Sequence, residues 1–529
     1  MKIRPSGSIR TAGRWRTVAI LLPIGLPLGI GCGQAFAQEQ AFRVVPSVRL
    51  TETVTDNVGL NGATGGQSSG SGKSESDWIT LISPSLRMEA RGGRLQGALN
   101  VGVNSSLYAN DSSRNQNTLS LLGAGKLEVL EKQAFIDVKS SISRQLVSVL
   151  GPRPADQVTG TSNQAEVRNF NVSPYVVGRF SDSGTMELRY TSDMTETDSA
   201  TVGRSVRQVW TASATDPRVT GRLGWAFSFS DSQVSSQSLR DTKQQSARFT
   251  GIVSIDPQLQ LRLIAGSEAN NLNSIDTTRN FISGIGLDWT PSPITRVGAT
   301  FEDRFFGPGY LISAENRQAH SSFRFSFSKD VSSISQSLFS GVTLYDLLML
   351  QYAAQYPDVN ARDSFVRNLI ATQAPGVGNP VVGAQAVLTN GLFLDRRVQL
   401  GMNFSGARNS LSLMTYRSER TSLVDRRFAL TGDLSSGATV KDLGASISAN
   451  HQLTPATSAT LALSATRSTR EDPTATVPHV STRTRMVSTG LTTTFSRKLN
   501  ASLMLRNSQG SGSADYKENA IVGSVFLQF

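Results

Sequence analysis

The chain has 529 residues, of which 38% are hydrophobic and 17% charged, and its formal net charge at pH 7 is +12. Five of its 52 Lys and Arg residues precede an apolar run near the amino terminus; without them 47 basic residues stand against 40 acidic ones, a net charge of +7. This small excess is not gathered into a basic stripe with interleaved aromatic residues, which argues against nucleic-acid binding. No later segment approaches 18 consecutive apolar residues, which excludes a helical membrane protein.

The amino terminus has the pattern of a secretory signal peptide. Basic residues precede the apolar run VAILLPIGLPLGIGCG, and the small residues of AFA follow it. The pattern predicts a signal peptide over residues 1–37 with cleavage after Ala37, which leaves residues 38–529 as the mature protein. The only cysteine, Cys32, lies in the removed segment, so the mature chain needs no disulfide and no cysteine metal site. LGIGC also resembles a lipoprotein cleavage box, but Gly29 replaces its usual leucine, and lipidation is the secondary interpretation.

Segments of about ten residues with apolar and polar side chains in alternation recur along the mature chain. In WITLISPSLRMEAR, Trp78, Ile82 and Met88 share one face of an extended strand, whereas Arg87 and Glu89 share the other. The tight turn RGGR and a second alternating segment, LQGALNVGVNSSLY, follow directly and predict a hairpin. Similar segments continue to the carboxyl terminus, a pattern typical of outer-membrane barrels.

Charged residues in the polar phase of these strands are expected to face a wet interior, because charges on the lipid face are costly. Most other residues in this phase are Ser, Thr, Asn, Gln and Gly, which suits contact with hydrated, largely uncharged molecules such as sugars. The charged residues predicted to face the lumen are Arg87, Glu89, Lys126, Glu128, Asp137, Lys139, Glu187, Arg189, Arg262 and Arg397.

The connections between strands alternate in length. Short turns such as EKQ, TDPR and DPQ alternate with longer polar segments such as GPRPADQVTGTSNQ and TREDPTATVPHVSTRT, which we expect to be external loops. We therefore predict an all-β fold: a transmembrane, antiparallel, up-and-down β-barrel with an even number of strands, about 22 and within 18–24.

Residues 343–372 depart from the strand pattern. Leu344, Leu347, Leu348 and Gln351 follow helical spacing, and Pro357 separates them from a second short helical segment. Barrels of about 22 strands enclose a plugged lumen, so this helical insert is either a plug or a cap on one rim, and the spacing does not distinguish the two.

Aromatic residues fall near the expected strand ends. Trp78, Tyr108, Tyr190, Trp210 and Trp289 are interpreted as girdles at the membrane interfaces, with an aromatic sugar track inside the lumen as the alternative.

The sequence contains no convincing catalytic or cofactor site. His320, His451 and His479 are far apart and lack neighbouring ligand patterns, so no metal site is predicted. The Gly-Lys-Ser within GATGGQSSGSGKSES lacks the glycine spacing of a phosphate loop and is interpreted as linker. No nucleophile, base and orienting group stand together, so we predict a protein that is not an enzyme and has no cofactor.

The last strand, AIVGSVFLQF, ends on Phe529. This terminal strand resembles those of bacterial outer-membrane barrels, whose aromatic last residue is read by the barrel-assembly machinery. Ile521, Gly523, Val525 and Leu527 share its apolar phase.

Three longer stretches carry a resemblance to the outer-membrane barrels associated with PEP-CTERM/exosortase and exopolysaccharide gene clusters. These stretches are TETVTDNVGLNG, DWTPSPITRVGATFEDRFFGPGY and DYKENAIVGSVFLQF, and the motif residues are Thr55, Asp56, Asn57, Trp289, Pro291, Arg304, Phe305, Phe306, Gly307, Tyr516, Glu518 and Asn519. The resemblance covers essentially the whole mature chain, and it implies a bacterial outer-membrane location and a pathway more than a mechanism. The Gly of RFFG is interpreted as marking a bend in the wall.

Our leading hypothesis from the sequence is an outer-membrane barrel that takes part in exopolysaccharide export or surface assembly, the conduit itself being one such role. Its expected partners are outer-membrane lipid, the barrel-assembly machinery, and a polysaccharide with its export machinery. A general diffusion porin and a sealed barrel that acts as a surface scaffold or adhesin are the alternatives.

Overall fold

The computed structural model describes residues 42–61, 74–156, 158–159, 161–199, 203–237, 240–272, 274–332, 392–423, 433–434, 437–472, 479–496 and 498–529, together with the single residues Met349 and Val366. The described barrel belongs to one compact unit, Ala41–Phe529, and a separate unit, Met1–Gln40, lies outside the described residues. The predicted signal peptide and, apart from Met349 and Val366, the predicted helical insert at 343–372 also lie outside them.

Twenty-two strands form within the described residues. They are β1 (Phe42–Thr55), β2 (Asp77–Arg91), β3 (Leu95–Tyr108), β4 (Gln116–Leu130), β5 (Ala134–Leu146), β6 (Gln164–Arg179), β7 (Thr185–Thr197), β8 (Ser205–Thr220), β9 (Leu223–Ser236), β10 (Thr242–Asp256), β11 (Leu259–Asn270), β12 (Thr278–Ser292), β13 (Thr295–Arg304), β14 (Gly307–Arg317), β15 (Ser321–Ser332), β16 (Phe393–Ser405), β17 (Asn409–Ser422), β18 (Thr439–Gln452), β19 (Thr457–Glu471), β20 (His479–Ser496), β21 (Leu499–Gly512) and β22 (Tyr516–Gln528). A single turn of 3-10 helix, η1 (Ser112–Arg114), follows β3.

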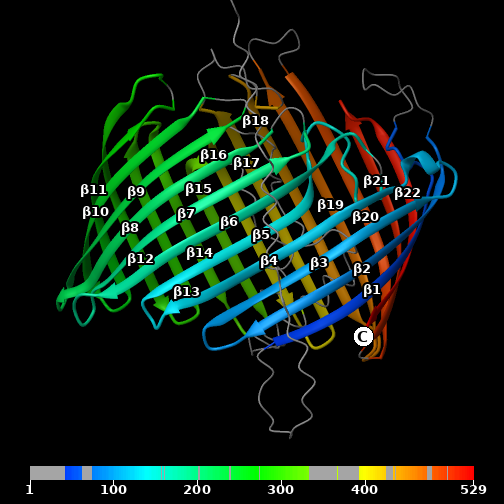
Figure 1. The fold of residues 1–529 in the computed structure, drawn as a ribbon, viewed down its shortest axis with the longest axis horizontal. Helices are drawn as coiled ribbons and strands as arrows, with labels where there is room; N and C mark the ends of the chain where they lie inside the picture. Colours follow the sequence, from blue (N-terminus) through cyan, green and yellow to red (C-terminus); the bar gives the residue numbers. More distant parts are fainter. Residues whose placement is uncertain are drawn as a thin grey trace, which may run out of the picture. The chain divides into compact units, whose positions relative to one another are not determined.

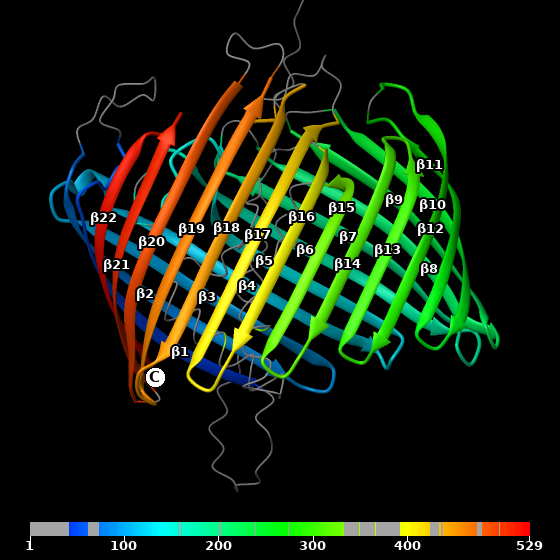
Figure 2. The same cartoon turned by 180° about the vertical axis from the view of Figure 1, so that it is seen from behind.

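Each strand pairs antiparallel with its neighbours in the chain, and the sheet closes on itself because β1 pairs with β22. The closing register runs from Ser47 opposite Gln528 to Thr55 opposite Ala520. Figures 1 and 2 show the tilted strands from the two sides of the resulting barrel. The predicted fold class, an antiparallel barrel of about 22 strands, is confirmed.

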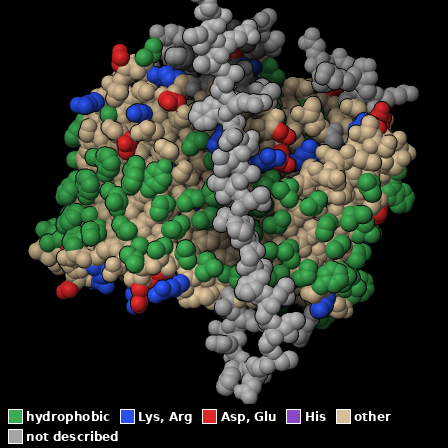
Figure 3. Space-filling model, viewed as in Figure 1, with side chains coloured by type: hydrophobic (Ala, Val, Ile, Leu, Met, Phe, Trp, Pro, Cys, Tyr) green, Lys and Arg blue, Asp and Glu red, His purple; other side chains and the backbone are tan. Residues whose placement is uncertain are grey.

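The barrel wall has an apolar outer face and a mostly polar inner face. Large apolar side chains at alternate positions are exposed, such as Trp78 (56%), Leu263 (63%) and Phe281 (69%). On the side of the barrel drawn in Figure 3, hydrophobic side chains gather in a band across the strands, and charged side chains lie mainly near its edges. Alternation of this kind places one phase of each strand outside and the other inside, as in membrane barrels.

Among the residues that the structure describes, no helix is both long and apolar enough to cross a membrane.

Connections at the end of the barrel that carries Phe529 are short. The expected turn TDPR is the exception among the turn predictions, because Asp216 to Arg218 lie within β8 and the chain turns at Gly221 instead. Gly221 has φ = +50°, a conformation that glycine adopts without the steric cost of a side chain. Most of the longer connections lie at the opposite end, which we call the mouth.

The terminal strand β22 has the alternation that its sequence predicts. Ile521 and Val525 are exposed on the outer face, whereas Ala520 and Val522 are buried. The amide of Phe529 donates a hydrogen bond to the Pro46 carbonyl on β1 (3.0 Å), so the last residue is held at the closing seam. Its role as an assembly signal stays a prediction.

The aromatic residues do not all lie on the outer face. Trp78, Trp210 and Trp289 are exposed there, and Tyr190 packs against Trp210 with ring centroids 4.8 Å apart. Tyr108, however, is only 4% exposed, and its hydroxyl donates a hydrogen bond to the Val158 carbonyl. The girdle interpretation is therefore wrong for Tyr108, which faces the interior.

Candidate functional site: a loop folded into the barrel mouth

The connection between β5 and β6, residues 147–163, is held together at its base by one amide side chain. Asn163 accepts a hydrogen bond from the Ser148 amide at Oδ1 (2.8 Å). Its Nδ2 donates to the carbonyls of Ser148 (2.8 Å) and Pro152 (2.9 Å). These bonds satisfy backbone groups that would otherwise be unpaired in a loop withdrawn from water. We call residues 147–163 the mouth loop.

Asp156 organises the tip of the mouth loop. Its Oδ1 accepts hydrogen bonds from the amides of Val158 (3.1 Å) and Thr159 (2.8 Å) and from the Thr159 hydroxyl (2.6 Å), which closes an Asx-turn. Its Oδ2 accepts from Nη1 of Arg506 on β21 (2.7 Å). Burial alone raises the pKa of Asp156, but the Arg506 charge and the Thr159 hydrogen bonds outweigh it and hold that pKa below its ordinary value. The carboxylate is therefore charged when the loop is in place.

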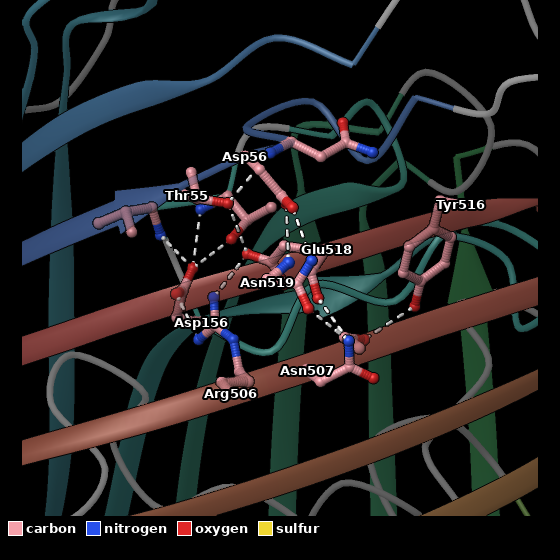
Figure 4. Close-up of polar contacts among 12 residues, drawn as sticks. Thr55, Asp56, Asp156, Arg506, Asn507, Tyr516, Glu518 and Asn519 are labelled. Atoms are coloured by element: carbon pink, nitrogen blue, oxygen red, sulfur yellow. Dashed lines mark hydrogen bonds and ion pairs between the residues drawn. The ribbon is translucent and has the colours of Figure 1, made fainter.

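Arg506 joins the mouth loop to the closing seam of the barrel. Its Nη2 lies 2.7 Å from Glu518 Oε1 on β22, and the Thr55 hydroxyl on β1 donates to the same oxygen (3.2 Å). The side chains of Arg506 and Glu518 are only 3% and 1% exposed. Figure 4 shows Asp156 and Glu518 on either side of the Arg506 guanidinium. Removing one partner of a buried pair costs about 3–5 kcal/mol when the other charge is left uncompensated, so this triad fixes the loop firmly.

Arg153 anchors the mouth loop on a different part of the wall. It donates hydrogen bonds to the hydroxyls of Ser468 (2.7 Å) and Thr466 (3.2 Å) on β19. Its guanidinium also lies 3.7 Å from Asp442 on β18, and Asp442 in turn lies 3.5 Å from Arg420 on β17. Two arginines therefore share one buried carboxylate at this anchor.

Two apolar clusters complete the seating of the mouth loop. One consists of Val158 with Val58, Ile79, Leu81 and Tyr108. The other consists of Val149 with Phe393, Leu434 and Val440, and Leu150 packs against it. Complete burial of each such side chain contributes about 1.5–3 kcal/mol, so both flanks of the loop are held by apolar packing as well as by charge.

The connection between β17 and β18 reaches the mouth loop through Asp433. Its carboxylate accepts hydrogen bonds from the Ser148 hydroxyl and from the Val149 amide, each at 2.7 Å. Burial raises the pKa of Asp433, and these two hydrogen bonds oppose the rise. The Leu150 carbonyl nearby accepts from the hydroxyls of Thr482 (2.6 Å) and Ser513 (2.9 Å).

The strands that supply these partners are not neighbours of β5 or β6. The loop leaves the wall between β5 and β6 but contacts β18 to β22, and β1 to β4 separate the two regions on one side of the closed sheet. The contacts are therefore made across the interior of the mouth. GPRPADQVTGTSNQ is one of the longer connections at the mouth, as its length predicts, and that this end is external stays a prediction. Its described part folds inward, where both of its charges, Arg153 and Asp156, have partners.

Two of the stretches that carry the family resemblance meet at the closing seam. Asp56 accepts hydrogen bonds from the Asn519 amide (2.7 Å) and side chain (2.6 Å). Asn57 donates to the Lys517 carbonyl (3.0 Å), and Thr55 binds Glu518 as described above. Residues at the end of β1 and the start of β22 thus lock the first strand to the last (Figure 4).

The third stretch forms a charged cluster at a hairpin. Arg304 lies 2.8 Å from Glu268, 3.4 Å from Asp330 and 3.6 Å from Glu302, with its side chain 6% exposed. Gly307 has φ = +81° and starts β14 directly after the turn, which agrees with the predicted bend at RFFG.

The charges predicted to face the lumen lie in the strand phase opposite most of the exposed apolar side chains; Leu122 and Leu130 on β4 are exceptions. The charges are Arg87, Glu89, Lys126, Glu128, Asp137, Lys139, Glu187, Arg189, Arg262 and Arg397. That they line a water-filled passage stays a prediction.

Half of these charges form one cluster on β4, β5 and β7. Arg189 lies 3.0 Å from Asp137 and 2.8 Å from Glu187, and its guanidinium stacks over the Tyr175 ring at 3.7 Å. Lys126 lies over the same ring at 5.6 Å, and the neighbouring Glu128 accepts a hydrogen bond from the Lys132 amide. The other contacts are Arg87 with Glu89, Arg262 with Asp288 (2.7 Å), Arg397 with Asp395 (3.0 Å), and Lys139 opposite Asn171 in the register.

The sequence analysis missed the residues that hold the mouth loop. Asp156 followed by Thr159 is a recognisable Asx-turn signal, and Pro152 and Pro154 indicate a stiff segment. Nothing in this local pattern identifies Arg506, which is 350 residues away in the sequence, as the partner.

No group of three or more His, Cys, Asp or Glu side chains in the described part of the chain could hold a metal ion.

The comparisons with known proteins identify similarity to solved barrels only. No protein-family model and no curated protein matches the chain. The siderophore receptor PirA from Pseudomonas aeruginosa is similar at 10% identity and a TM-score of 0.39, covering 92% of this chain and 80% of its own. The apoprotein form of the FrpB iron transporter from Neisseria meningitidis (F5-1 variant) is similar at 10% identity and a TM-score of 0.47, and the match covers 92% of this chain and 81% of the transporter. OccK5 (OpdH) from Pseudomonas aeruginosa is similar at 9% identity and a TM-score of 0.32, and the match covers 92% of this chain and 98% of OccK5.

Proposed function

We propose that the chain is an outer-membrane β-barrel of porin or receptor type that takes part in exopolysaccharide export or surface assembly as a conduit. The apolar outer face and polar inner face support a membrane location, because only a closed barrel or a helix satisfies all backbone hydrogen bonds in lipid. The observation that carries the conduit role is the mouth loop, which is fixed across the interior by Asp156 and Arg153. A segment in that position controls what passes.

The inner face supports an uncharged, hydrated cargo. Many of its charges are compensated locally, as Arg189 is by Asp137 and Glu187. Paired charges offer hydrogen-bonding groups but produce little net electrostatic field in the interior. Many serine and threonine hydroxyls lie between them. A neutral polysaccharide, which is rich in hydroxyl groups, fits such a surface better than a highly charged polymer does.

Planar-bilayer recording on purified residues 38–529 tests the proposal. We expect small or no conductance from the native protein and larger conductance when Asp156→Asn releases the mouth loop, with or without deletion of residues 343–372. Neutral oligosaccharides should then reduce the current in steps as they pass. No conductance from any of these forms would end the conduit proposal.

A sealed barrel that acts as a surface scaffold or adhesin is the second candidate, and the two apolar clusters around the mouth loop favour it because they stabilise the closed arrangement. It predicts unchanged surface binding after the lumen is blocked chemically. Liposome swelling with sugars of graded size separates the remaining alternative, a general diffusion porin, since a porin admits small sugars without release of the loop.

A further inference from the structure

Several arginines on the outer face of the barrel lie at the edge of the apolar region, toward the mouth. Arg417 on β17 is opposite Leu443 on β18, Leu443 is opposite Arg467 on β19, and Arg467 is opposite Arg483 on β20. Leu443 is 54% exposed, and residues paired in register share one face of the sheet, so all three arginines point outward. Arg485 follows Arg483 in the same phase, and all four arginines are exposed. The strands that carry them are in front in Figure 2.

This group, Arg417, Arg467, Arg483 and Arg485, is named the outer arginine cluster. Within the described residues none of its members makes an ion pair. The nearest carboxylates of the same face lie closer to the mouth. Glu419 is one row away, opposite Lys441 in the register, and Glu471 is two rows away, with its carboxylate 2.6 Å from Lys441. No carboxylate of the described residues therefore compensates the positive charge of the cluster.

The arrangement of Arg467 and Arg483 is unfavourable without a counter-anion. The two residues are direct partners in an antiparallel pair, where side chains leave the sheet about 5 Å apart and like charges destabilise the pairing. On the opposite wall, the outward Arg168 instead has Glu166 at 2.7 Å. A positively charged row without internal partners indicates a ligand that supplies the negative charge.

The surroundings of the cluster define the chemistry of that ligand. Toward the opposite end of the barrel the same strands continue with exposed apolar side chains, such as Leu461 (42%), Val487 (45%) and Leu491 (47%). A bound molecule must therefore carry its anionic groups beside acyl chains. Guanidinium groups bind phosphate oxygens through paired hydrogen bonds, more strongly than they bind neutral acceptors.

We propose that the outer arginine cluster binds the phosphate groups of a phosphorylated glycolipid in the membrane leaflet at the mouth side. The inference rests on the membrane location proposed above but not on the conduit. Leu443, between Arg417 and Arg467, would contact the first carbons of the acyl chains, while the guanidinium groups flank the phosphates.

Binding is tested on the full mature chain in neutral detergent by native mass spectrometry. The probes are a bis-phosphorylated, acylated glucosamine disaccharide, the same lipid without phosphates, and inorganic phosphate. We expect Arg467→Gln with Arg483→Gln to weaken binding of the phosphorylated lipid at least about tenfold, and the control Arg168→Gln to leave it unchanged. Heat-dependent gel mobility checks that each variant retains the folded barrel.

Thermal unfolding gives a second readout that a purely structural role would not produce. Without lipid, Arg467→Gln should raise the Tm by about 1 °C, since it removes like-charge repulsion. With the phosphorylated lipid, the same variant should gain less Tm than the native protein gains.

Three results would overturn the inference: equal binding of the phosphorylated lipid by the double variant and the native chain, equal binding of the lipid without phosphates, or saturation of the site by inorganic phosphate alone. Because the assay needs no conductance, failure of the conduit proposal would leave this result interpretable.

Discussion

Replacement of Asp156 by Asn should weaken docking of the mouth loop without unfolding its tip. The Asn side chain keeps an acceptor oxygen for the amides of Val158 and Thr159, so the Asx-turn survives. What it loses is the negative charge 2.7 Å from Arg506. The substitution therefore isolates the ion pair that connects the loop to the opposite wall.

The magnitude follows from what Arg506 retains. A hydrogen bond to a charged group contributes about 1.5–3 kcal/mol, whereas a buried charge left wholly without a partner costs about 3–5 kcal/mol. Arg506 keeps Glu518 at 2.7 Å, so the smaller range applies and we expect a loss of about 2 kcal/mol in loop docking. At 1.4 kcal/mol for each factor of ten, the undocked population should rise about thirtyfold.

Cysteine labelling measures this change. The mature chain is expected to contain no cysteine, so Val158→Cys places a single thiol in the apolar cluster, at a position that is 2% exposed. The labelling rate with a polar maleimide should rise about thirtyfold when Asp156→Asn is added. Asp111→Asn is the matched control, because Asp111 also caps a turn, through Ser113, but is exposed. Equal labelling rates in the two backgrounds would refute our account of the Arg506 contact.

Four further predictions concern the same end of the barrel and its interior. Because the pKa of Asp156 is held below 3.8, its contribution to loop docking is complete above that value and is lost as pH falls through the lowered pKa; labelling at residue 158 should speed up there. Asp433 has a raised pKa, so its protonation favours docking, and docking should strengthen as pH falls from that pKa to 3.8. Asp433→Asn should abolish this strengthening, which the labelling rate at residue 158 would show. Asp56→Ala removes both hydrogen bonds to Asn519 and should lower the free energy of unfolding of the barrel by about 1–3 kcal/mol. Heat-dependent gel mobility should show this as a lower unfolding temperature. Arg49, which is 6% exposed and has no carboxylate partner in the described residues, should favour anions in the loop-released barrel, and an unchanged reversal potential in Arg49→Gln would contradict this.

The barrel itself could be predicted because its physical cause is local. Each strand must present apolar side chains outward and polar ones inward, and this requirement repeats every two residues, as Trp78, Ile82 and Arg87 show. The prediction of TDPR as a turn was wrong because β8 continues past these residues to Thr220, and aspartate and proline can occur near the end of a strand. Propensity alone does not locate such a strand end.

The mouth loop could not be predicted because its position depends on contacts between distant segments. A polar loop with two prolines is equally compatible with an exterior position, and only the buried partners Arg506 and Asp442 draw Asp156 and Arg153 inward. Tyr108 illustrates the same limit, since an aromatic residue at a strand end suits the membrane interface until its hydroxyl finds the Val158 carbonyl inside.

One guanidinium group links the mouth loop to the closing seam of the barrel. Arg506 binds Asp156 of the mouth loop and Glu518 of the last strand, and Glu518 also accepts the hydroxyl of Thr55 on the first strand. The mouth loop therefore has this complete anchor only when β21, β22 and β1 are all in place. Docking of the loop at Arg506 and pairing of β1 with β22 thus stabilise each other through the shared carboxylate of Glu518.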